Sequence, residues 1–297
     1  MAMAETASVK VFIRLRPYNQ REKDIGLEKE KDFIKFSGGS KNLKVGGHDH
    51  TFDRIFPMSS AQEAIYEHSA KDTVDDIMVG YNGTLFAYGQ TGSGKSFTMM
   101  GPESESGPVN DDPEMWGIIP RAIRQIFEYI QSAPQEMTFQ LSVSYLEVYR
   151  EVIRDLLDTR NTNLAVRESK TRGTYVEGCA TIGVATEAEV HQVIQLGDAA
   201  RAVGATNMNA HSSRSHSVLI IKVEQQSSSG AVKTGVLNLV DLAGSERVKK
   251  SGVEGQSFEE ACAINTSLTN LGTVMTQLCQ DPTKVMESAR YDSVSWV

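Results

Sequence analysis

An eight-residue stretch at 89–96 matches the phosphate-binding pattern G-x-x-x-x-G-K-[ST] and constrains the fold more than any other feature. The stretch consists of Gly89, Gln90, Thr91, Gly92, Ser93, Gly94, Lys95 and Ser96. In this pattern the loop amides bind phosphate oxygens, the lysine contacts the β- and γ-phosphates, and the last hydroxyl ligates Mg²⁺. The apolar segment 84–88 predicts a buried strand before the loop, and a helix is expected after it. The sequence therefore predicts a nucleoside triphosphate site.

Two later motifs fit the other parts of such a site. Residues 209–216 read N-A-H-S-S-R-S-H, and residues 241–246 read D-L-A-G-S-E directly after the apolar segment 236–240. An aspartate at the end of a buried strand is where a P-loop enzyme holds its metal through water, which points to Asp241. Gly244 leaves its N–H free to approach a γ-phosphate. Each motif alone fits an ordinary capped loop or Asx turn, but all three in this order indicate one site.

Together these motifs resemble the kinesin motor domain. The matching segments are 14–17, 81–95, 209–216, 241–246, 264–268 and 271–272, so the resemblance runs from about residue 8 to about residue 280. It implies a P-loop NTPase of the α/β class that hydrolyses ATP to ADP with Mg²⁺. It also implies that hydrolysis changes the grip of the domain on microtubules, because switch loops ordered by a γ-phosphate convert chemistry into movement.

The resemblance assigns roles residue by residue. The residues that it assigns to catalysis are Lys95, Ser212, Ser213, Arg214, Gly244 and Glu246. Arg214 and Glu246 match a pair that forms a salt bridge when the switches close, and Glu246 then orients and deprotonates the attacking water. The implied magnesium ligands are Ser96 and Ser213, with Asp241 acting through water.

Other positions match the adenine side of the pocket. They are Arg14, Arg16 and Pro17. Phe97, directly after the P-loop, has two interpretations of equal weight: a stacking partner of the base, or an aromatic side chain packed in the core.

Alternating strands and helices predict a mixed, mainly parallel sheet with helices on both faces, in one domain spanning 1–297. We expect strands at 9–15, 139–145, 218–223 and 236–240, the last two joined by a turn at 227–230, and a small hairpin lobe at 31–56. We expect helices from Ser59 or Ser60 to about Val79, at 120–131, at 187–203, and from near Ser257. In the last helix Ile264, Leu268, Leu271, Met275 and Leu278 share one face.

Composition agrees with a soluble cytosolic enzyme, and the resemblance implies that it associates with the microtubule cytoskeleton in the cytoplasm. Of the 297 residues 40% are hydrophobic, and neither a membrane-spanning run nor a signal peptide is visible. Three scattered cysteines indicate free thiols. The net charge of −8 argues against nucleic acid as a partner.

An acidic chain needs local basic patches to bind acidic tubulin, because salt screens charges beyond about 10 Å at 0.1 M. Arg160, Arg167, Lys170 and Arg172 against Glu168 give residues 160–172 a local charge of +3 and match a tubulin-contacting region of the family. Lys249 and Lys250, with Arg247, form a second candidate patch. The alternative for both is an ordinary solvated face.

The chain departs from the family pattern in two places. Glu259 and Thr266 replace lysines of the microtubule-facing helix, so we expect weak, salt-dependent microtubule binding in the loose state. Residues 289–297 only partly match a P-Y-R-D-S-type sequence. We therefore expect a motor domain incomplete at its C-terminus, without the last helices, one core strand and the neck linker, and unable to step alone. Cargo or a coiled-coil partner would then bind through regions absent from this chain.

Three functional classes compete. They are a microtubule-stimulated ATPase motor, a non-motile kinesin-like microtubule-binding or regulatory module, and another P-loop enzyme. A complete catalytic set favours the first. Ser215-His216 and Gly244-Ser245-Glu246 distinguish the chain from myosins, and no N-K-x-D motif for guanine is present.

Overall fold

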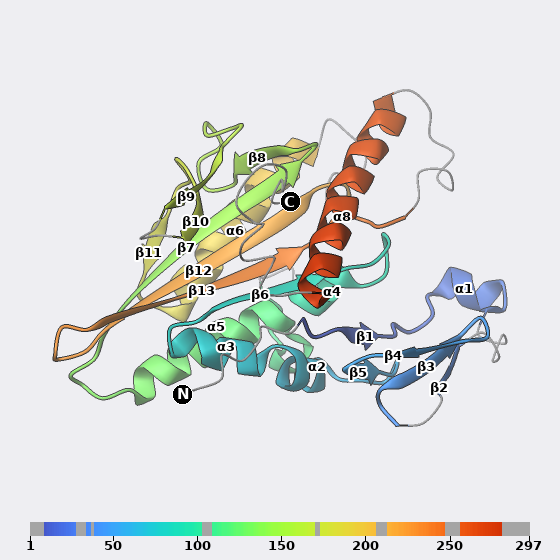
Figure 1. The fold of residues 1–297 in the computed structure, drawn as a ribbon, viewed down its shortest axis with the longest axis horizontal. Helices are drawn as coiled ribbons and strands as arrows, with labels where there is room; N and C mark the ends of the chain where they lie inside the picture. The colour runs from blue at the N-terminus through green and yellow to red at the C-terminus, as the bar shows by residue number, and fades with distance from the viewer. Residues whose placement is uncertain are drawn as a thin grey trace.

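The computed structural model describes residues 9–27, 34–36, 39–102, 109–169, 173–205, 213–246 and 256–280. Its centre is a six-stranded sheet with the order β11-β7-β12-β13-β6, in which β8 also pairs with β7 (Figure 1). The strands are β6 (Asn82–Ala87), β7 (Thr138–Tyr149), β8 (Val152–Asp155), β11 (Ile182–Val184), β12 (His216–Gln226) and β13 (Val232–Asp241). These bounds contain the strands expected at 139–145, 218–223 and 236–240.

Strand direction in this sheet differs from the prediction. Only β13 and β6 pair in parallel, whereas β7, β8, β11, β12 and β13 pair with one another antiparallel. For β12 and β13 the cause is a tight hairpin, where Ser227 N–H donates to Ala231 O at 3.0 Å and Gly230 has a φ of +80°. A direct return of this kind makes neighbouring strands antiparallel, while a parallel pair needs a crossover. The α/β fold with a mixed sheet is confirmed, but the expectation of mainly parallel pairing was wrong for the described residues.

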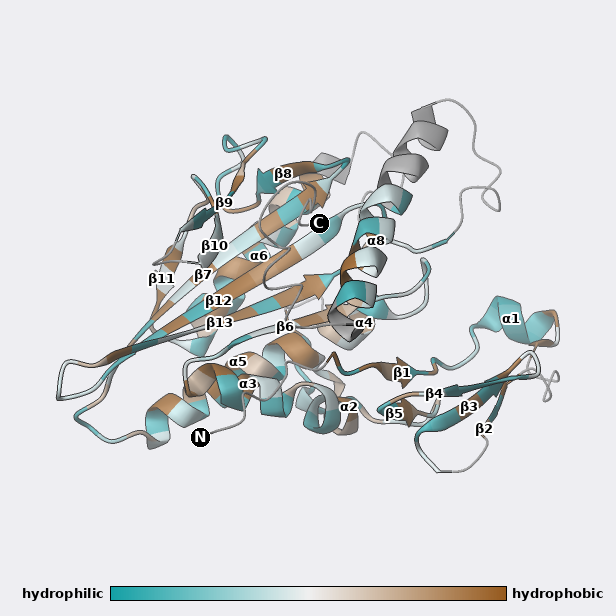
Figure 2. Cartoon of the chain, viewed as in Figure 1, coloured by the Kyte–Doolittle hydropathy of each residue, from teal (hydrophilic) through white to brown (hydrophobic). Residues whose placement is uncertain are grey.

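Helices cover both faces of the sheet. They are α2 (Gln62–Ser69), α3 (Lys71–Met78), α4 (Lys95–Met99), α5 (Ile118–Ser132), α6 (Glu187–Ala205) and α8 (Gln256–Gln280). Helices α2 to α6 share one large apolar cluster with the strands, and α8 packs on the opposite face through Leu268 and Leu271 (Figure 1). Alternation along β6 serves both clusters, because Leu85 and Ala87 contact the first and Phe86 the second. Figure 2 shows this apolar character in the central strands and the helices beside them.

The helix expected from Ser59 or Ser60 to Val79 is two helices. Ala70, with φ −126° and ψ −35°, ends α2 and begins α3, and the N-cap of α2 is Ala61, which has no side-chain cap. Both helices pack on α5, where Tyr66 of α2 donates a hydrogen bond to Gln125. The break lets α3 pack against β6 and β13 as well. The predicted cap and the predicted continuous helix were therefore both wrong.

The small N-terminal lobe is confirmed. It contains the antiparallel strands β2 (Ile34–Phe36), β3 (Asn42–Val45) and β4 (His48–Thr51). Gly46 and Gly47 join β3 to β4 with φ values of +56° and +90°, a turn conformation that glycine adopts without strain. Beside it β1 (Phe12–Arg14) pairs in parallel with β5 (Arg54–Phe56), so β1 is shorter than the strand expected at 9–15.

Two further strands were not predicted. They are β9 (Val166–Ser169) and β10 (Gly173–Val176), which form an antiparallel hairpin within the segment between β8 and β11. Among the helices in the described part of the chain, none has the length and apolar character needed to cross a membrane. The expectation for residues 289–297 lies outside the described residues.

Candidate nucleotide-binding site

The P-loop lies where two parallel strands end together. Ala87, the last residue of β6, is in register with Asp241, the last residue of β13. Ligands of α/β proteins bind outside the carboxyl ends of such strands. Gly92 and Gly94 have φ values of +76° and +96°, and within the described part of the chain a Cβ on either would contact nothing within 4 Å. The loop therefore curls with open space beside it, as a phosphate cradle requires.

Hydrogen bonds bring the three sequence motifs together. The backbone N–H of Gly244 donates to Ser213 O at 2.8 Å, and that of Ser245 donates to Gly89 O at 3.1 Å. The segment that follows β13 thus contacts both the end of the 209–216 motif and the start of the P-loop. Ser212 lies outside the described residues. The described parts of the three motifs thus lie together, and their action as one nucleotide site stays a prediction.

Lys95 is held close to the loop that it serves. Its Nζ donates to Gly89 O at 3.0 Å and to Gln90 O at 3.2 Å. Burial lowers the pKa of Lys95, and the nearby Asp241 and Glu246 carboxylates oppose that change. The ammonium group is therefore half-buried, and its two hydrogen-bond acceptors are neutral carbonyl groups. Because they do not neutralise its positive charge, the group is suited to bind phosphate.

Ser96 and Asp241 form the predicted metal end of the site. Ser96 Oγ donates a hydrogen bond to Asp241 Oδ2. The other carboxylate oxygen, Oδ1, is buried and has no hydrogen-bond partner in the described part of the molecule. Burial raises the pKa of Asp241, partly offset by the Ser96 hydrogen bond and the charges of Arg201 and Lys95. A buried carboxylate oxygen with spare accepting capacity beside a serine hydroxyl fits hydrated Mg²⁺, a hard ion that keeps several waters.

Glu246 is docked on the P-loop. Its Oε2 accepts a hydrogen bond from Thr91 N–H at 2.8 Å, and its Oε1 accepts one from the Thr91 hydroxyl at 2.6 Å. Burial would raise the pKa of Glu246, but the hydrogen bonds from Thr91 and from the backbone of Glu246, with the charge of Lys95, together outweigh it and the pKa is lowered. The group is thus an ionised carboxylate beside the phosphate loop. Its predicted salt bridge with Arg214 stays a prediction for the closed switches.

The residues expected near adenine divide into two groups. The Arg14 guanidinium lies 5.1 Å from the centre of the Phe97 ring and donates to Thr98 Oγ1 at 2.8 Å. One face of Phe97 is therefore covered by Arg14, a favourable cation–π arrangement. Arg16 instead pairs with Glu22 at 2.5 Å and donates to Pro17 O at 3.0 Å, which ties it to the capping box of α1 (Gln20–Asp24).

Gln62 is a site residue that the sequence analysis missed. This buried side chain accepts from Arg14 at 2.8 Å and donates to the carbonyl oxygens of Phe97 at 2.8 Å and Met115 at 3.2 Å. It thereby connects β1, α4 and the turn at 113–115. A polar residue three and four positions before Ile65 and Tyr66, on the buried face of α2, was the signal available in the sequence.

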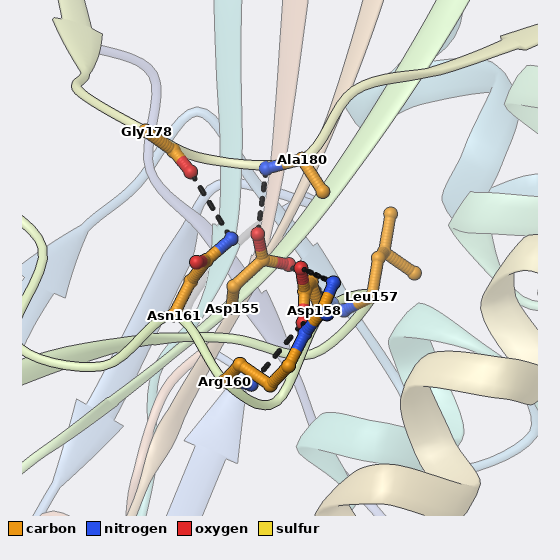
Figure 3. A network of polar contacts seen from close by, with 7 residues as sticks. All are labelled: Asp155, Leu157, Asp158, Arg160, Asn161, Gly178 and Ala180. Atoms are coloured by element: carbon orange, nitrogen blue, oxygen red, sulfur yellow. Dashed lines mark hydrogen bonds and ion pairs between the residues drawn. The ribbon is translucent and has the colours of Figure 1, made fainter.

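The first predicted basic patch is built on a buried carboxylate. Asp155 Oδ2 accepts from Ala180 N–H at 2.6 Å, and its Oδ1 accepts from Leu157 and Asp158 N–H at 2.8 and 3.1 Å (Figure 3). Asn161 Nδ2 adds a bond to Gly178 O at 3.2 Å (Figure 3). These contacts fix both ends of the segment that carries the β9–β10 hairpin.

Neighbouring carboxylates neutralise two of the predicted basic residues. Arg160 makes two hydrogen bonds of 2.8 Å with Asp158, and Arg167 pairs with Glu177 at 3.0 Å. Both partners lie outside the 160–172 window that gave the local charge of +3. Lys170, Arg172, Lys249 and Lys250 lie outside the described residues.

Comparison with known proteins identifies the family. The model of the kinesin motor domain matches residues 14–291. Kinesin-related protein 3 of Dictyostelium discoideum is 44% identical over 279 residues, or 92% of this chain. The kinesin heavy chain of Neurospora crassa is 48% identical over 275 residues, or 91%, and human kinesin heavy chain isoform 5A is 45% identical over 282 residues, or 94%.

A solved structure agrees with these relatives. It is described as that of a fast kinesin, with implications for its ATPase mechanism and its interactions with microtubules. Its TM-score is 0.82 at 45% identity, covering 97% of this chain and 78% of the other. The three relatives are much longer, since the chain spans 23%, 29% and 26% of their lengths.

Proposed function

Because this chain belongs to the kinesin motor domain family, we propose that it is a microtubule-binding, microtubule-stimulated ATPase. The observation that carries the proposal is the assembly of the nucleotide site. The P-loop, Ser213 and the 241–246 segment are joined by hydrogen bonds, with Glu246 placed on the loop at Thr91. Phosphoryl transfer depends mostly on positioning and charge stabilisation, which such loops supply.

Each part of the nucleotide site has its own task in ATP hydrolysis. Lys95 and the loop amides bind the phosphates, while Ser96, Ser213 and Asp241 hold hydrated Mg²⁺, which neutralises phosphate charge when bound. Glu246 is ionised and lies beside the P-loop. As the switches close, its carboxylate leaves Thr91 and contacts the attacking water and Arg214 instead. Arg14 and Phe97 contact the adenine base.

The partner in this proposal is the microtubule, and the cellular place is the microtubule cytoskeleton of the cytoplasm. Helix α8 is the next described element after the 241–246 segment, and residues 247–255 connect the two. A shift of that segment would therefore reach a candidate track-binding helix. The β9–β10 hairpin supplies the second candidate contact. That residues 1–297 act as one motor domain is part of the same proposal.

One experiment separates the motor from its alternatives. Turnover of ATP and of GTP is measured with and without microtubules for the wild type, Lys95→Ala and Glu246→Ala. We expect ATP-selective turnover that microtubules accelerate, loss of tight ATP binding in Lys95→Ala, and retained binding with turnover reduced roughly 100-fold or more in Glu246→Ala. Microtubule binding without turnover would favour the non-motile module, and preference for GTP would indicate another P-loop enzyme.

A further inference from the structure

Two family-motif residues have no part in the nucleotide site described above. His216 ends the 209–216 motif and begins β12, and Ser267 lies within the 264–268 motif on α8. Both are 3% exposed. They lie 51 residues apart in sequence, yet their side chains touch.

The His216 imidazole bridges two elements, one at each nitrogen. Nδ1 lies 3.0 Å from the backbone N of Ala243, and Nε2 lies 2.9 Å from Ser267 Oγ. A backbone N–H can only donate, so Nδ1 must be the unprotonated acceptor. The neutral ring then carries its proton on Nε2 and donates it to Ser267. Burial, with the charges of Arg201 and Lys95, lowers the pKa of His216 to about 4, in agreement with a neutral ring.

The two bridged elements have different neighbours. Ala243 precedes Gly244, whose N–H donates to Ser213, and Ser245 contacts Gly89 of the P-loop. Ser267 precedes Leu268, which packs with Leu242 and Ala243 in the small apolar cluster under α8. The imidazole is therefore a directional polar contact beside an apolar interface. Apolar contacts allow sliding, whereas a ring bonded at both nitrogens fixes relative position.

We propose that His216 is a positioning residue that couples the 241–246 segment to helix α8. A displacement of Ala243 alters the plane and position of the ring, and Ser267 follows because it accepts from the opposite nitrogen. Coupling of this kind is reciprocal, so a microtubule that moves α8 also biases the segment carrying Gly244 and Glu246. The inference rests on the proposed microtubule-stimulated ATPase function and adds the side-chain link through which stimulation passes.

The main test removes the acceptor on α8. Ser267→Ala removes the hydroxyl that accepts the Nε2 bond, while Ser267→Thr keeps a hydroxyl group. In Ser267→Ala we expect the maximal microtubule-stimulated rate to fall about tenfold, with basal turnover and ADP affinity within about twofold of wild type. Ser267→Thr should restore most of the stimulation. Circular dichroism and a thermal melt establish that each variant is folded.

A double-variant cycle tests the ring itself. His216→Asn keeps an acceptor near the Nδ1 position but does not reach Ser267. If the link acts as a unit, the double variant His216→Asn/Ser267→Ala loses no more stimulation than His216→Asn alone. Additive losses would overturn the inference.

A spectroscopic measurement needs neither ATP hydrolysis nor microtubules. Long-range ¹H–¹⁵N spectra of the ¹⁵N-histidine-labelled protein report the tautomer of each ring, and the His216 signals are assigned with His216→Asn. We expect the Nε2-protonated tautomer in wild type, and the Nδ1-protonated form would overturn the bridge. If microtubules stimulate Ser267→Ala as strongly as wild type, the coupling role of His216 is overturned but the proposed function is not. A wild type that microtubules do not stimulate would overturn the proposed function, and the inference with it.

Discussion

The contact between Glu246 and Thr91 explains why position 244 is glycine. A Cβ at residue 244 would overlap the Glu246 carboxylate and the Thr91 hydroxyl. Any side chain there would have to displace Glu246 from the P-loop before the segment could close. Gly244 therefore has a packing role in addition to the approach to phosphate expected from the sequence.

His216 gives a residue-scale prediction on pH. The unfolded chain binds a proton at this ring near its ordinary pKa of 6.5, whereas the folded protein binds one only near pH 4. Between these values the unfolded state holds more protons, so the free energy of unfolding falls as the pH falls. We expect wild type to lose about 2 kcal/mol more than His216→Asn between about pH 7 and about pH 5. Urea unfolding at both pH values measures this, and equal losses in the two proteins would contradict it.

At the scale of single elements, α6 is fixed to the sheet by close packing. A Cβ on Gly197 would overlap the ring of Tyr145 in β7, whose hydroxyl donates to Asp198 at 2.8 Å. Tyr145 is 7% exposed and held at its far end, so it cannot move aside easily. Gly272 of α8 provides a contrast, because a Cβ there meets no atom of the described residues within 4 Å.

These two helical glycines form a matched pair for measurement. Both gain the helix propensity of alanine, so the difference between the variants isolates packing. We expect Gly197→Ala to lower the free energy of unfolding by about 1–3 kcal/mol through overpacking. We expect Gly272→Ala to raise it by about 0.5–1 kcal/mol. Urea unfolding curves of the two variants decide the point, and a neutral Gly197→Ala would show that α6 shifts freely on β7.

Elements with local signals were predictable from the sequence, and those set by tertiary contacts were not. Apolar segments located β12 and β13, and Gly46-Gly47 located the hairpin of the lobe. No glycine or proline marks the break at Ala70. Both helices pack on α5, and the break lets α3 pack on β6 and β13 as well.

The same division holds for the site. Short motifs with fixed spacing identified the P-loop and Asp241, because phosphate chemistry dictates those residues. The contacts of Gln62, and the bridge from His216 to Ser267, join residues far apart in the chain. No local pattern encodes such partners, although a polar side chain on an apolar helix face marks a position to inspect.

At the scale of the whole molecule, charge is distributed so that basic residues meet acidic neighbours. Residues 155–178 contain four basic and four acidic side chains, although the shorter window 160–172 alone is basic. Arg160 and Arg167 are engaged by Asp158 and Glu177. An acidic protein that binds an acidic track through this hairpin would thus do so weakly, and salt would weaken it further.

Removing those two carboxylates should therefore strengthen microtubule binding. In Asp158→Asn/Glu177→Gln both arginines keep hydrogen-bonding neighbours but lose the opposing charges. We expect the dissociation constant for microtubules to fall about 3- to 10-fold at low salt, with a steeper salt dependence, as for charges at the rim of an interface. Cosedimentation across a salt series measures both quantities.

A second double variant controls for net charge. Glu67→Gln/Asp72→Asn removes the same number of carboxylates, one from α2 and one from α3. In the wild type Glu67 pairs with Lys71 and Asp72 pairs with Lys10, both at the surface. If the β9–β10 hairpin contacts the microtubule, this control tightens binding much less than Asp158→Asn/Glu177→Gln, because screening confines each charge to its own neighbourhood. Equal tightening by both variants would mean that only total charge matters, and the hairpin would then lose its place as a candidate contact.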